Sequence, residues 1–322
     1  MLNYSETMPP MRCISVVVPV YNGAKTIPKL IEQLDKYLRP QNALELILVN
    51  DGSTRDNSDE VCEAAAQQND WIVYIELSTN FGEHNAVMAG LNHSTGDCVV
   101  IMDDDLQNPP HEVIRLVDEL DRGDYDVVFS FYKKKQQGMI RNLGSAFNNQ
   151  AATYILKKPR DLYLSSFKCI RRSLVKEIIK YDGPSPYIDG LILRSTNRFG
   201  RLEVEHCARE FGRSNYTLRK LMSLWLSMFK NFSIMPLRIA SAIGLLLATL
   251  SGLAGIVVII EKIMNPDLPT GWASLFVALL FMSSVQLLAI GLMGEYLGGV
   301  LMKLNKTPQF VVRRTIRSKE PA

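Results

Sequence analysis

Short apolar segments rich in β-branched residues recur through the first part of the chain and alternate with segments of helical pattern. One of them, Cys98–Met102, is apolar throughout, which is typical of a strand buried on both faces of a sheet. Similar segments span residues 13–20, 44–50, 71–77 and 126–131, and helical patterns lie between them, for example to about residue 38 and at residues 57–69. This alternation predicts an α/β domain with a parallel, doubly wound, Rossmann-like sheet.

Three aspartates, Asp103, Asp104 and Asp105, directly follow the apolar segment that ends at Met102. Neighbouring side chains of an extended backbone point in opposite directions, so Asp103 and Asp105 share one side while Asp104 faces the other. Open α/β sheets bind ligands at the carboxyl ends of their strands. Two carboxylates and the amide oxygen of Gln107 suit Mg²⁺ or Mn²⁺. An acidic turn leading into a helix N-terminus explains the triplet alone about equally well.

Polar residues also follow the other predicted strands. They are Tyr21 and Asn22 after the first, Asp51 and Ser53 after the second, and Asn80 and Asn85 after the third. Each alone is more often a turn former or helix cap. Because parallel strands bring their carboxyl ends to one edge, we expect a nucleotide to lie there. A carboxylate such as Asp51 can accept the N3–H of uracil, a donor with no counterpart on cytosine.

Several classes of function are disfavoured by what the chain lacks. It has neither a G-x-G-x-x-G nor a G-x-x-x-x-G-K-[ST] motif, which argues against a dinucleotide oxidoreductase and a P-loop NTPase. A net charge of +3 without a basic-aromatic patch argues against nucleic acid as a partner. The five cysteines are scattered without C-x-x-C spacing and predict reduced, cytosolic thiols. The polar N-terminus predicts no signal peptide.

Four motifs carry a resemblance to a known family: SVVVPVYN, VNDGSTRD, NFGEHNAVMAGL and DDDLQNPP. In this order and spacing they resemble the family 2 glycosyltransferases of the GT-A fold. Within that family they are similar to the polyprenyl-phosphate glycosyltransferases, the class of dolichyl-phosphate mannose synthase and the bactoprenol glucosyltransferases. The resemblance covers the chain from about residue 13 to its end. It implies an inverting transfer from a UDP-sugar to a polyprenyl phosphate, in a homo-oligomer such as a tetramer.

The resemblance also implies roles for residues of the predicted sheet edge. The residues implied to hold the nucleoside are Pro19, Tyr21, Asn22 and Asp51, and we expect Asp104 beside them. The residues implied to carry Mg²⁺ or Mn²⁺ on the sugar-nucleotide diphosphate are Asp103, Asp105 and Gln107. We therefore count Asp103 and Asp105 as catalytic.

Basic residues in the middle of the chain are candidates for binding the acceptor. Arg141 and Ser145 are four apart and share a face of any helix there. They match the family positions that grip the lipid phosphate, and Arg forms forked contacts with phosphate, so we count Arg141 with Asp103 and Asp105 as catalytic. The segment REFGRSNY resembles the family pattern R-x-x-G-x-S-x-Y, which implies that Arg209 and Arg213 bind the diphosphate or the acceptor phosphate. The lysine run 133–135 is more simply a solvated basic face.

One departure from the family concerns the general base. Many bactoprenol glucosyltransferases have an Asp just before the Phe of a segment that resembles residues 165–168, and this chain has Ser166 there. A phosphate monoester has a second pKa of about 6, so the acceptor is already largely a dianion at neutral pH. A nucleophile that needs no deprotonation needs no base.

The last third of the chain predicts membrane attachment. Residues 216–235 mix apolar and basic side chains, as in a helix lying in the headgroup plane. Two runs, Ile239–Ile260 and Leu268–Gly294, carry no charge and meet the roughly 20 residues needed to cross a bilayer. Basic residues flank both runs on their outer sides, which places both ends in the cytoplasm by the positive-inside rule. The basic residues after the second run are Lys303, Lys306, Arg313, Arg314, Arg317 and Lys319.

The resulting domain prediction has four parts. They are a cytoplasmic GT-A domain (1–215), an interfacial region (216–235), two transmembrane helices (236–302) and a cytoplasmic basic tail (303–322). A processive polysaccharide synthase is a rival, but it would carry a Q-x-x-R-W-type segment and a larger membrane part, and neither is found. A non-catalytic membrane adaptor with the same fold is a second rival, and loss of turnover in Asp105→Ala would exclude it.

Overall fold

The computed structural model describes residues 12–40, 42–132, 162–205, 207 and 271–318, together with scattered positions between 242 and 264. The chain divides into two compact units, one of Met1–Thr217 with Thr307–Ala322 and one of Leu218–Lys306, and each is described by itself. Some predicted features lie outside the described residues: Arg141, Ser145, Arg209, Arg213 and the interfacial region 216–235.

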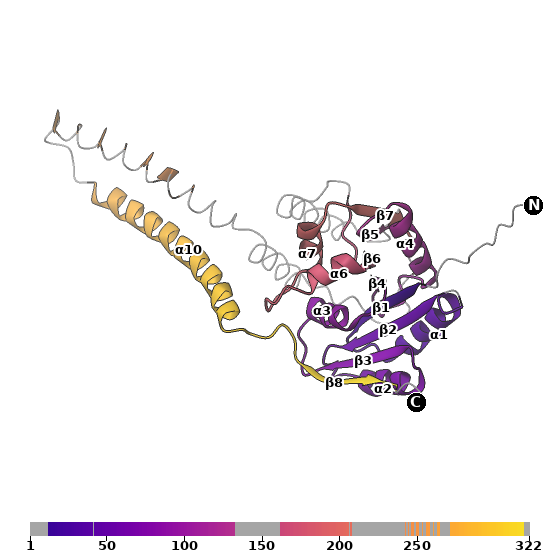
Figure 1. The fold of residues 1–322 in the computed structure, drawn as a ribbon. Coiled ribbons are helices and arrows are strands. Elements are labelled where there is room, and N and C mark those ends of the chain that lie inside the picture. Colours follow the sequence, from indigo (N-terminus) through magenta and orange to yellow (C-terminus); the bar gives the residue numbers. More distant parts are fainter. Residues whose placement is uncertain are drawn as a thin grey trace, which may run out of the picture. The chain divides into compact units, whose positions relative to one another are not determined.

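An eight-stranded sheet forms the centre of the first unit, with the order β7-β5-β6-β4-β1-β2-β3-β8 (Figure 1). The strands are β1 (Cys13–Val20), β2 (Ala43–Asn50), β3 (Ile72–Leu77), β4 (Cys98–Ile101), β5 (Val127–Phe131), β6 (Lys168–Arg171), β7 (Phe199–Glu203) and β8 (Val312–Arg317). The helices of this unit are α1 (Ile27–Tyr37), α2 (Ser58–Gln68), α3 (Glu83–His93), α4 (His111–Arg122), α6 (Arg172–Ile178) and α7 (Ile188–Ser195).

Strands β1 to β4 are parallel and are connected through α1, α2 and α3, which confirms the predicted Rossmann-like part of the fold. Strand β1 pairs with both β2 and β4, so the strand order reverses between β1 and β4. Ligands of open α/β sheets bind at such a switch point, outside the carboxyl ends of the strands. The loops after β1 and β4 are therefore the first place to look for a site.

The prediction of an all-parallel sheet is wrong for two strands. Strand β6 is antiparallel to both β4 and β5, and β8 is antiparallel to β3. Strand β6 has only four residues, too few to display a period. Strand β8 has three arginines among its six residues and reads as a solvated basic run. Part of the predicted basic tail is therefore an edge strand of this sheet.

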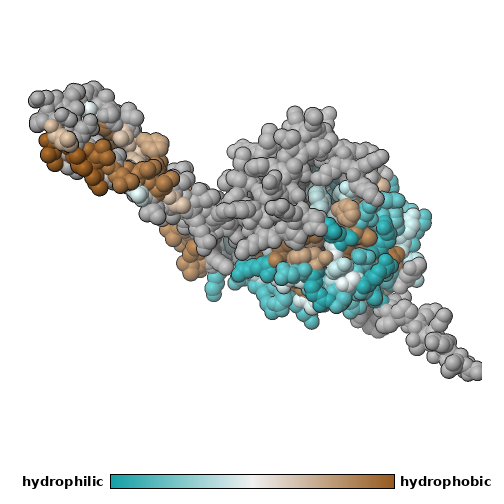
Figure 2. Space-filling view, turned by 90° about the horizontal axis from the view of Figure 1, so that it is seen from above, coloured by the Kyte–Doolittle hydropathy of each residue, from teal (hydrophilic) through white to brown (hydrophobic). Residues whose placement is uncertain are grey.

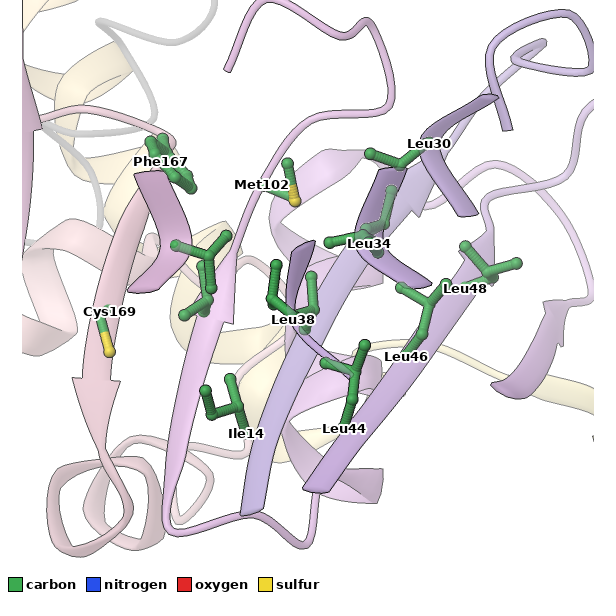
Figure 3. Close-up of a cluster of buried hydrophobic side chains, with 14 of the residues drawn as sticks. Ile14, Leu30, Leu34, Leu38, Leu44, Leu46, Leu48, Met102, Phe167 and Cys169 are labelled. Carbon is green, nitrogen blue, oxygen red and sulfur yellow. The ribbon is translucent and has the colours of Figure 1, made fainter. Parts of the chain in front are cut away.

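Helix α1 shows how the apolar pattern produces the core on one face of the sheet. Leu30, Leu34 and Leu38 follow one another at helical spacing, are fully buried and pack over β1 and β2 (Figure 3). Burying such side chains contributes about 2 kcal/mol each, and we expect Leu34→Ala to cost about 3 kcal/mol. Helices α2 and α4 add to the same cluster, whereas α3 contacts β1 and β2 and contributes none of its buried residues to it. Helix α3 therefore covers the opposite face.

The second unit contains α10 (Trp272–Leu304), a helix of 33 residues. Within it Phe281–Met302 is long and apolar enough to cross a membrane, and none of it is buried inside the protein. Large apolar side chains such as Leu287 and Leu297 are exposed, and they gather as brown surface along this unit (Figure 2). The span extends past the uncharged run that ends at Gly294, includes Glu295 and lies within the predicted transmembrane region 236–302. The described positions between 242 and 264, most of which lie in the first predicted run, are helical and mostly exposed.

Candidate functional site

Two loops meet at the switch point, one after β1 and one after β4. They lie together because β1 and β4 are paired as far as Val17 and Ile101, and the backbone N–H of Met102 donates to the carbonyl of Val17 (3.1 Å). The first loop begins at Tyr21, whose side chain is 42% exposed. The second loop carries the three aspartates.

Pro19 lies inside β1, paired with Val49 of β2, and the chain leaves the β4 side of the ladder before it. The carbonyl of Val17 bonds toward β4, and alternate residues of a strand face the same neighbour, so the ring nitrogen of Pro19 also faces that side. Pairing of β1 with β4 has ended by then. The missing donor of Pro19 therefore costs no ladder hydrogen bond.

Asn22 ties the loop after β1 to the loop after β2. Its φ of 58° lies in the left-handed region, which Asn tolerates better than most residues. Its backbone N–H donates to Ser53 Oγ (2.9 Å), and its side-chain oxygen accepts the backbone N–H of Arg55 (3.0 Å). These two bonds hold the two loops, which contain candidate nucleoside ligands, in one arrangement.

Asp51 is buried and joins the loop after β2 to the start of α3. Its two carboxylate oxygens accept the backbone N–H groups of Phe81 (2.7 Å) and Gly82 (2.9 Å). Burial raises the pKa of Asp51, and these two hydrogen bonds oppose the rise. The next residue, Gly52, has a φ of +63°, and a Cβ there would lie 2.7 Å from the backbone nitrogen of Asn80. Only glycine fits this close approach without strain.

Asp103 and Asp104 reach different partners. The Asp103 carboxylate accepts a hydrogen bond from the hydroxyl of Ser166 (2.7 Å). Asp104 lies against the loop after β1, because a Cβ on Gly23 would lie 2.1 Å from Asp104 Oδ2. The absence of a side chain at Gly23 thus lets this carboxylate approach the candidate nucleoside loop.

The turn after Asp105 is held from two directions. The Asp105 carboxylate accepts the backbone N–H of Gln107 (3.1 Å), and Leu106 between them has a φ of 60°. A non-glycine residue in this region costs of order 1–3 kcal/mol and is found most often at functional sites. The carbonyl of Gln107 accepts the backbone N–H of Cys207 (2.9 Å), which joins the turn to the chain after β7.

Three carboxylates, Glu83, Asp103 and Asp105, concentrate negative charge at this point, and we call them the switch-point acids. Burial and then the charge of Glu83 raise the pKa of Asp103 to about 7, with a further contribution from Asp105. The hydroxyl of Ser166 and the ammonium of Lys168 only partly offset this rise. A bound divalent cation would relieve the excess charge. The donor types of the predicted set therefore fit Mg²⁺ or Mn²⁺.

Two residues of this site, Glu83 and Ser166, were not among the predicted ones. Glu83 is the first residue of α3 and reads in the sequence as a favourable helix start. The signal that could have identified Glu83 was its position directly after the loop that follows β3. Ser166 stood out only as the place where relatives have an Asp, and the structure gives it a hydrogen bond to a predicted metal ligand instead.

A buried polar group lies behind Asp103. Lys168 and Asp189 form an ion pair in which the two side chains are 4% and 11% exposed. His84 packs edge-on against Tyr187 with 5.2 Å between ring centres. Burial lowers the pKa of His84 to about 4, so it is neutral at pH 7. Because Lys168 acts electrostatically on both His84 and Asp103, this group contributes to the field of the site.

A second set of potential metal ligands lies elsewhere in the part of the chain that the structure describes. It consists of His111, Glu112 and Glu205, whose ligand atoms are within 4.8 Å of one another. The buried carboxylate of Glu112 already accepts bonds from Arg115 (2.7 and 2.9 Å) and from the backbone N–H of Glu205 (3.1 Å). Its charge is thus balanced within the chain.

Solved structures share this fold. A mycobacterial protein is 21% identical with a TM-score of 0.52, over 69% of this chain and 75% of its own. Glucosyl-3-phosphoglycerate synthase from Mycobacterium tuberculosis, in complex with Mn²⁺, UDP and glucosyl-3-phosphoglycerate, is 20% identical with a TM-score of 0.51, over 68% of this chain and 78% of its own. At these identities the likeness shows the fold alone.

Sequence relatives cover nearly the whole chain. Proteins named undecaprenyl-phosphate 4-deoxy-4-formamido-L-arabinose transferase are similar: that of Klebsiella pneumoniae (strain 342) is 31% identical over 98% of this chain and 97% of its own. That of Serratia proteamaculans (strain 568) is 33% identical over 95% of each. The profile of glycosyl transferase family 2 matches residues 15–179. This chain therefore belongs to glycosyl transferase family 2 and is a glycosyltransferase.

Proposed function

We propose that this enzyme transfers a sugar from a UDP-sugar to a polyprenyl phosphate with inversion at the anomeric carbon. A phosphate oxygen of the lipid forms the new bond to the anomeric carbon while the bond to the β-phosphate oxygen breaks, and UDP leaves. The products are a polyprenyl-phosphate sugar and UDP. No side chain has to remove a proton, because a phosphate monoester with a second pKa of about 6 is largely a dianion at neutral pH.

The observation that carries this proposal is the grouping of acidic side chains after β4 at the switch point, where the charges of Glu83 and Asp105 act on the buried carboxyl of Asp103. We assign Asp103, Asp105 and Gln107 as the residues that would hold Mg²⁺ or Mn²⁺. When bound, the ion would neutralise charge that develops on the departing diphosphate. A solved protein of the same fold that holds Mn²⁺ and UDP supports a divalent ion and a uridine nucleotide here.

The nucleoside is assigned to the loops after β1 and β2. Asn22 and Asp51 are fixed there by backbone hydrogen bonds, and Tyr21 is exposed at the rim. Each oxygen of Asp51 accepts one backbone N–H, and a carboxylate oxygen has a second lone pair that can accept the N3–H of uracil. Asp104 stands beside the same loop.

The acceptor is assigned to basic residues outside the described part of the chain, Arg141 with Ser145, and Arg209 with Arg213. The names of the relatives support undecaprenyl phosphate as the acceptor. If Arg141 grips the lipid phosphate, Arg141→Ala raises the KM for the lipid far more than the KM for the sugar nucleotide. Equal increases of both constants would contradict the assignment.

Membrane topology follows from the return of the chain to its first unit. The chain leaves that unit at Thr217 and comes back at Thr307 to supply β8. A segment that starts and ends on the same side of a membrane crosses it an even number of times. This supports two transmembrane helices, the second around Phe281–Met302. We assign the catalytic unit to the cytoplasmic side of a bacterial inner membrane from the basic residues that flank the two predicted runs. Arg313, Arg314 and Arg317 lie in β8 and are no longer free flanking charges. The homotetramer implied by the resemblance stays a prediction.

The sugar we propose is 4-deoxy-4-formamido-L-arabinose, which would place the enzyme in lipid A modification and polymyxin resistance. The shared name of relatives at 31–33% identity over nearly the whole chain supports this choice. The alternative is the same lipid-phosphate transfer with another donor, UDP-glucose or GDP-mannose, since the residues at the switch point would contact the diphosphate and nucleoside of each.

A competition assay tests the proposal. Purified full-length protein in detergent receives undecaprenyl phosphate, Mn²⁺ and equal amounts of UDP-4-deoxy-4-formamido-L-arabinose, UDP-glucose and GDP-mannose, and the lipid products are identified by mass spectrometry. We expect only the formamido-pentose product, and Asp105→Ala should abolish it. A hexose product would sink the choice of sugar, and turnover unchanged in Asp105→Ala would remove the proposed metal role.

A further inference from the structure

The strand that follows the second unit reaches toward the candidate nucleotide site. Strand β8 pairs antiparallel with β3, and Arg314 stands opposite Glu76 in this pairing. The ladder is extended by a bond from the backbone N–H of Ser78 to the carbonyl of Val311 (2.9 Å). The last described strand of the chain therefore lies beside β3, whose other neighbour β2 ends at the nucleoside loop.

Arg314 gathers three carboxylates around one guanidinium, and we call these four residues the β8 ion-pair cluster. Its Nη2 bonds to Asp59 (2.9 and 3.1 Å), its Nη1 lies 2.8 Å from Glu63, and its Nε bonds to Glu76. The guanidinium also lies over the ring of Tyr74, 5.8 Å from the ring centre. One side chain of β8 thus fixes groups from α2 and β3.

From Tyr74 the contacts continue to the nucleoside loop. The buried Tyr74 hydroxyl donates to Asp59 and accepts the side-chain N–H of Asn50 (3.2 Å). The side-chain oxygen of Asn50, the last residue of β2, accepts the backbone N–H of Ser53 (3.0 Å). Ser53 Oγ in turn accepts the backbone N–H of Asn22 (2.9 Å). An unbroken series of contacts therefore joins Arg314 to the loop assigned to the nucleoside.

This series supports a loop that has no regular structure of its own. Residues 51–54 form neither helix nor strand, and Asn22 and Gly52 both have positive φ values. The conformation of such a loop depends on the side chains that bond to it. A binding loop held in its bound conformation before the ligand arrives binds more tightly, because less ordering remains to be done.

We propose that Tyr74, Asn50 and Arg314 are positioning residues for the nucleoside loop, so that β8 completes the donor-nucleotide site. This rests on the proposed function, in which Asn22 and Asp51 hold the uracil nucleoside. The β8 ion-pair cluster then has two consequences. It holds β8 at the edge of the sheet, and it makes the affinity for the donor depend on whether β8 is in place there.

The test compares UDP binding and transfer in the full-length protein with single substitutions. Tyr74→Phe keeps the buried ring and removes only the hydroxyl, and Arg314→Gln changes the partly exposed end of the series. For each we expect Kd for UDP with Mn²⁺ and KM for the UDP-sugar to rise about tenfold, the effect of losing one hydrogen bond to a charged group. We expect kcat at saturating donor, and KM for undecaprenyl phosphate, to stay within about twofold, because the series contacts neither reacting atom.

Arg317→Gln is the matched control, because it removes the same charge from the same strand. Arg317 bonds to Glu45 (3.2 Å) and to the carbonyl of His93 (3.3 Å), away from the nucleoside loop. We expect its Kd for UDP to equal that of the wild type. In the double variant Tyr74→Phe/Arg314→Gln the loss should be clearly less than the product of the single losses, because both act through one series.

The outcomes separate this inference from the proposed function. An unchanged Kd for UDP in Tyr74→Phe and Arg314→Gln, or an equal loss in Arg317→Gln, would overturn the inference and leave the glycosyl transfer intact. A fall of kcat at unchanged KM would overturn it as well. Wild-type protein that binds no UDP with Mn²⁺ would overturn both. A rise of KM and Kd alone, partly restored in Arg314→Lys, supports it.

Discussion

Two acidic clusters in the first unit differ in the charges that surround their carboxylates. In the β8 ion-pair cluster, Asp59, Glu63 and Glu76 surround Arg314, and Arg313 adds a second contact to Glu76 (3.0 Å). The contacts with Glu76 and Asp59 raise the pKa of Arg314 further above its ordinary value. Among the switch-point acids, by contrast, burial and the charges of Glu83 and Asp105 raise the pKa of Asp103 to about 7.

The difference separates charge that serves the fold from charge that serves a ligand. Carboxylates paired with arginines have their charge balanced within the chain and stabilise the strand that they hold. A carboxylate such as Asp103, whose pKa is raised by burial and by neighbouring carboxylates, destabilises the protein when it is ionised, and this is expected where a cation or substrate binds. Removing a carboxylate should therefore have opposite effects on stability in the two clusters.

The largest expected effect is on turnover. Asp105→Asn keeps the size of the side chain and removes a charge that would hold the metal, so we expect kcat/KM for transfer to fall at least about 1,000-fold. Glu63→Gln makes the same chemical change in the β8 ion-pair cluster, and there we expect less than about a fivefold loss. Transfer of radiolabelled sugar to undecaprenyl phosphate measures both. Similar losses in the two variants would erase the distinction between the clusters.

The second effect is a pH-dependent gain of stability in Asp103→Asn without metal. The folded-state pKa of Asp103, about 7, lies above the ordinary carboxyl value of 3.8, so folding disfavours the ionised form. This cost is absent below about pH 4, grows as the pH rises and is complete above about pH 7. We expect the variant to melt about 4 °C higher than the wild type at pH 8 and equally at pH 4.

Saturating Mn²⁺ supplies the control for this experiment. It should raise the melting temperature of the wild type at pH 8 and leave Asp103→Asn nearly unchanged, because only the wild type offers the full set of ligands. A variant that melts lower than the wild type at pH 8 without metal would show that Asp103 is a stabilising charge after all.

A smaller effect of opposite sign is expected for Glu76→Gln. The Glu76 side chain is only 9% exposed and bonds both Arg313 and Arg314, so its removal leaves two cations without their main partner. We expect the free energy of unfolding to fall by about 2 kcal/mol, as for a partly buried ion pair that loses one member. Urea unfolding followed by tryptophan fluorescence measures this. A stability gain would place Glu76 with the switch-point acids.

The smallest effect is expected for Arg317→Gln. Half of the Arg317 side chain is exposed, and its ion pair with Glu45 is 3.2 Å long. Exposed pairs contribute about 0.5 kcal/mol or less, and salt screens them. The same unfolding assay should show this difference and its loss in 1 M NaCl. A change as large as that of Glu76→Gln would mean that any charge lost from β8 detaches the strand.

The sequence was sufficient for the parallel half of the sheet and for the place of its charged edge. Strands β1 to β4 are mostly apolar and rich in β-branched residues, and the rule that ligands bind at strand ends directed attention to Asp103 and Asp51. The sequence was insufficient wherever the partners of a residue lie far from it along the chain. The four residues of β6 carry no readable period, and the arginines of β8 show their purpose only beside Asp59 and Glu76. Glu83 reads as a helix start until its electrostatic effect on Asp103 is known.

The central claim is that Asp103, Asp105 and Gln107 bind one divalent cation that holds the diphosphate of the donor. Titration of full-length protein with Mn²⁺ at pH 8, followed by electron paramagnetic resonance with and without UDP, tests it most directly. The account predicts one Mn²⁺ per chain, bound more tightly with UDP present and lost in Asp105→Asn. Equal Mn²⁺ binding by wild type and Asp105→Asn, or UDP affinity that does not depend on Mn²⁺, would contradict it.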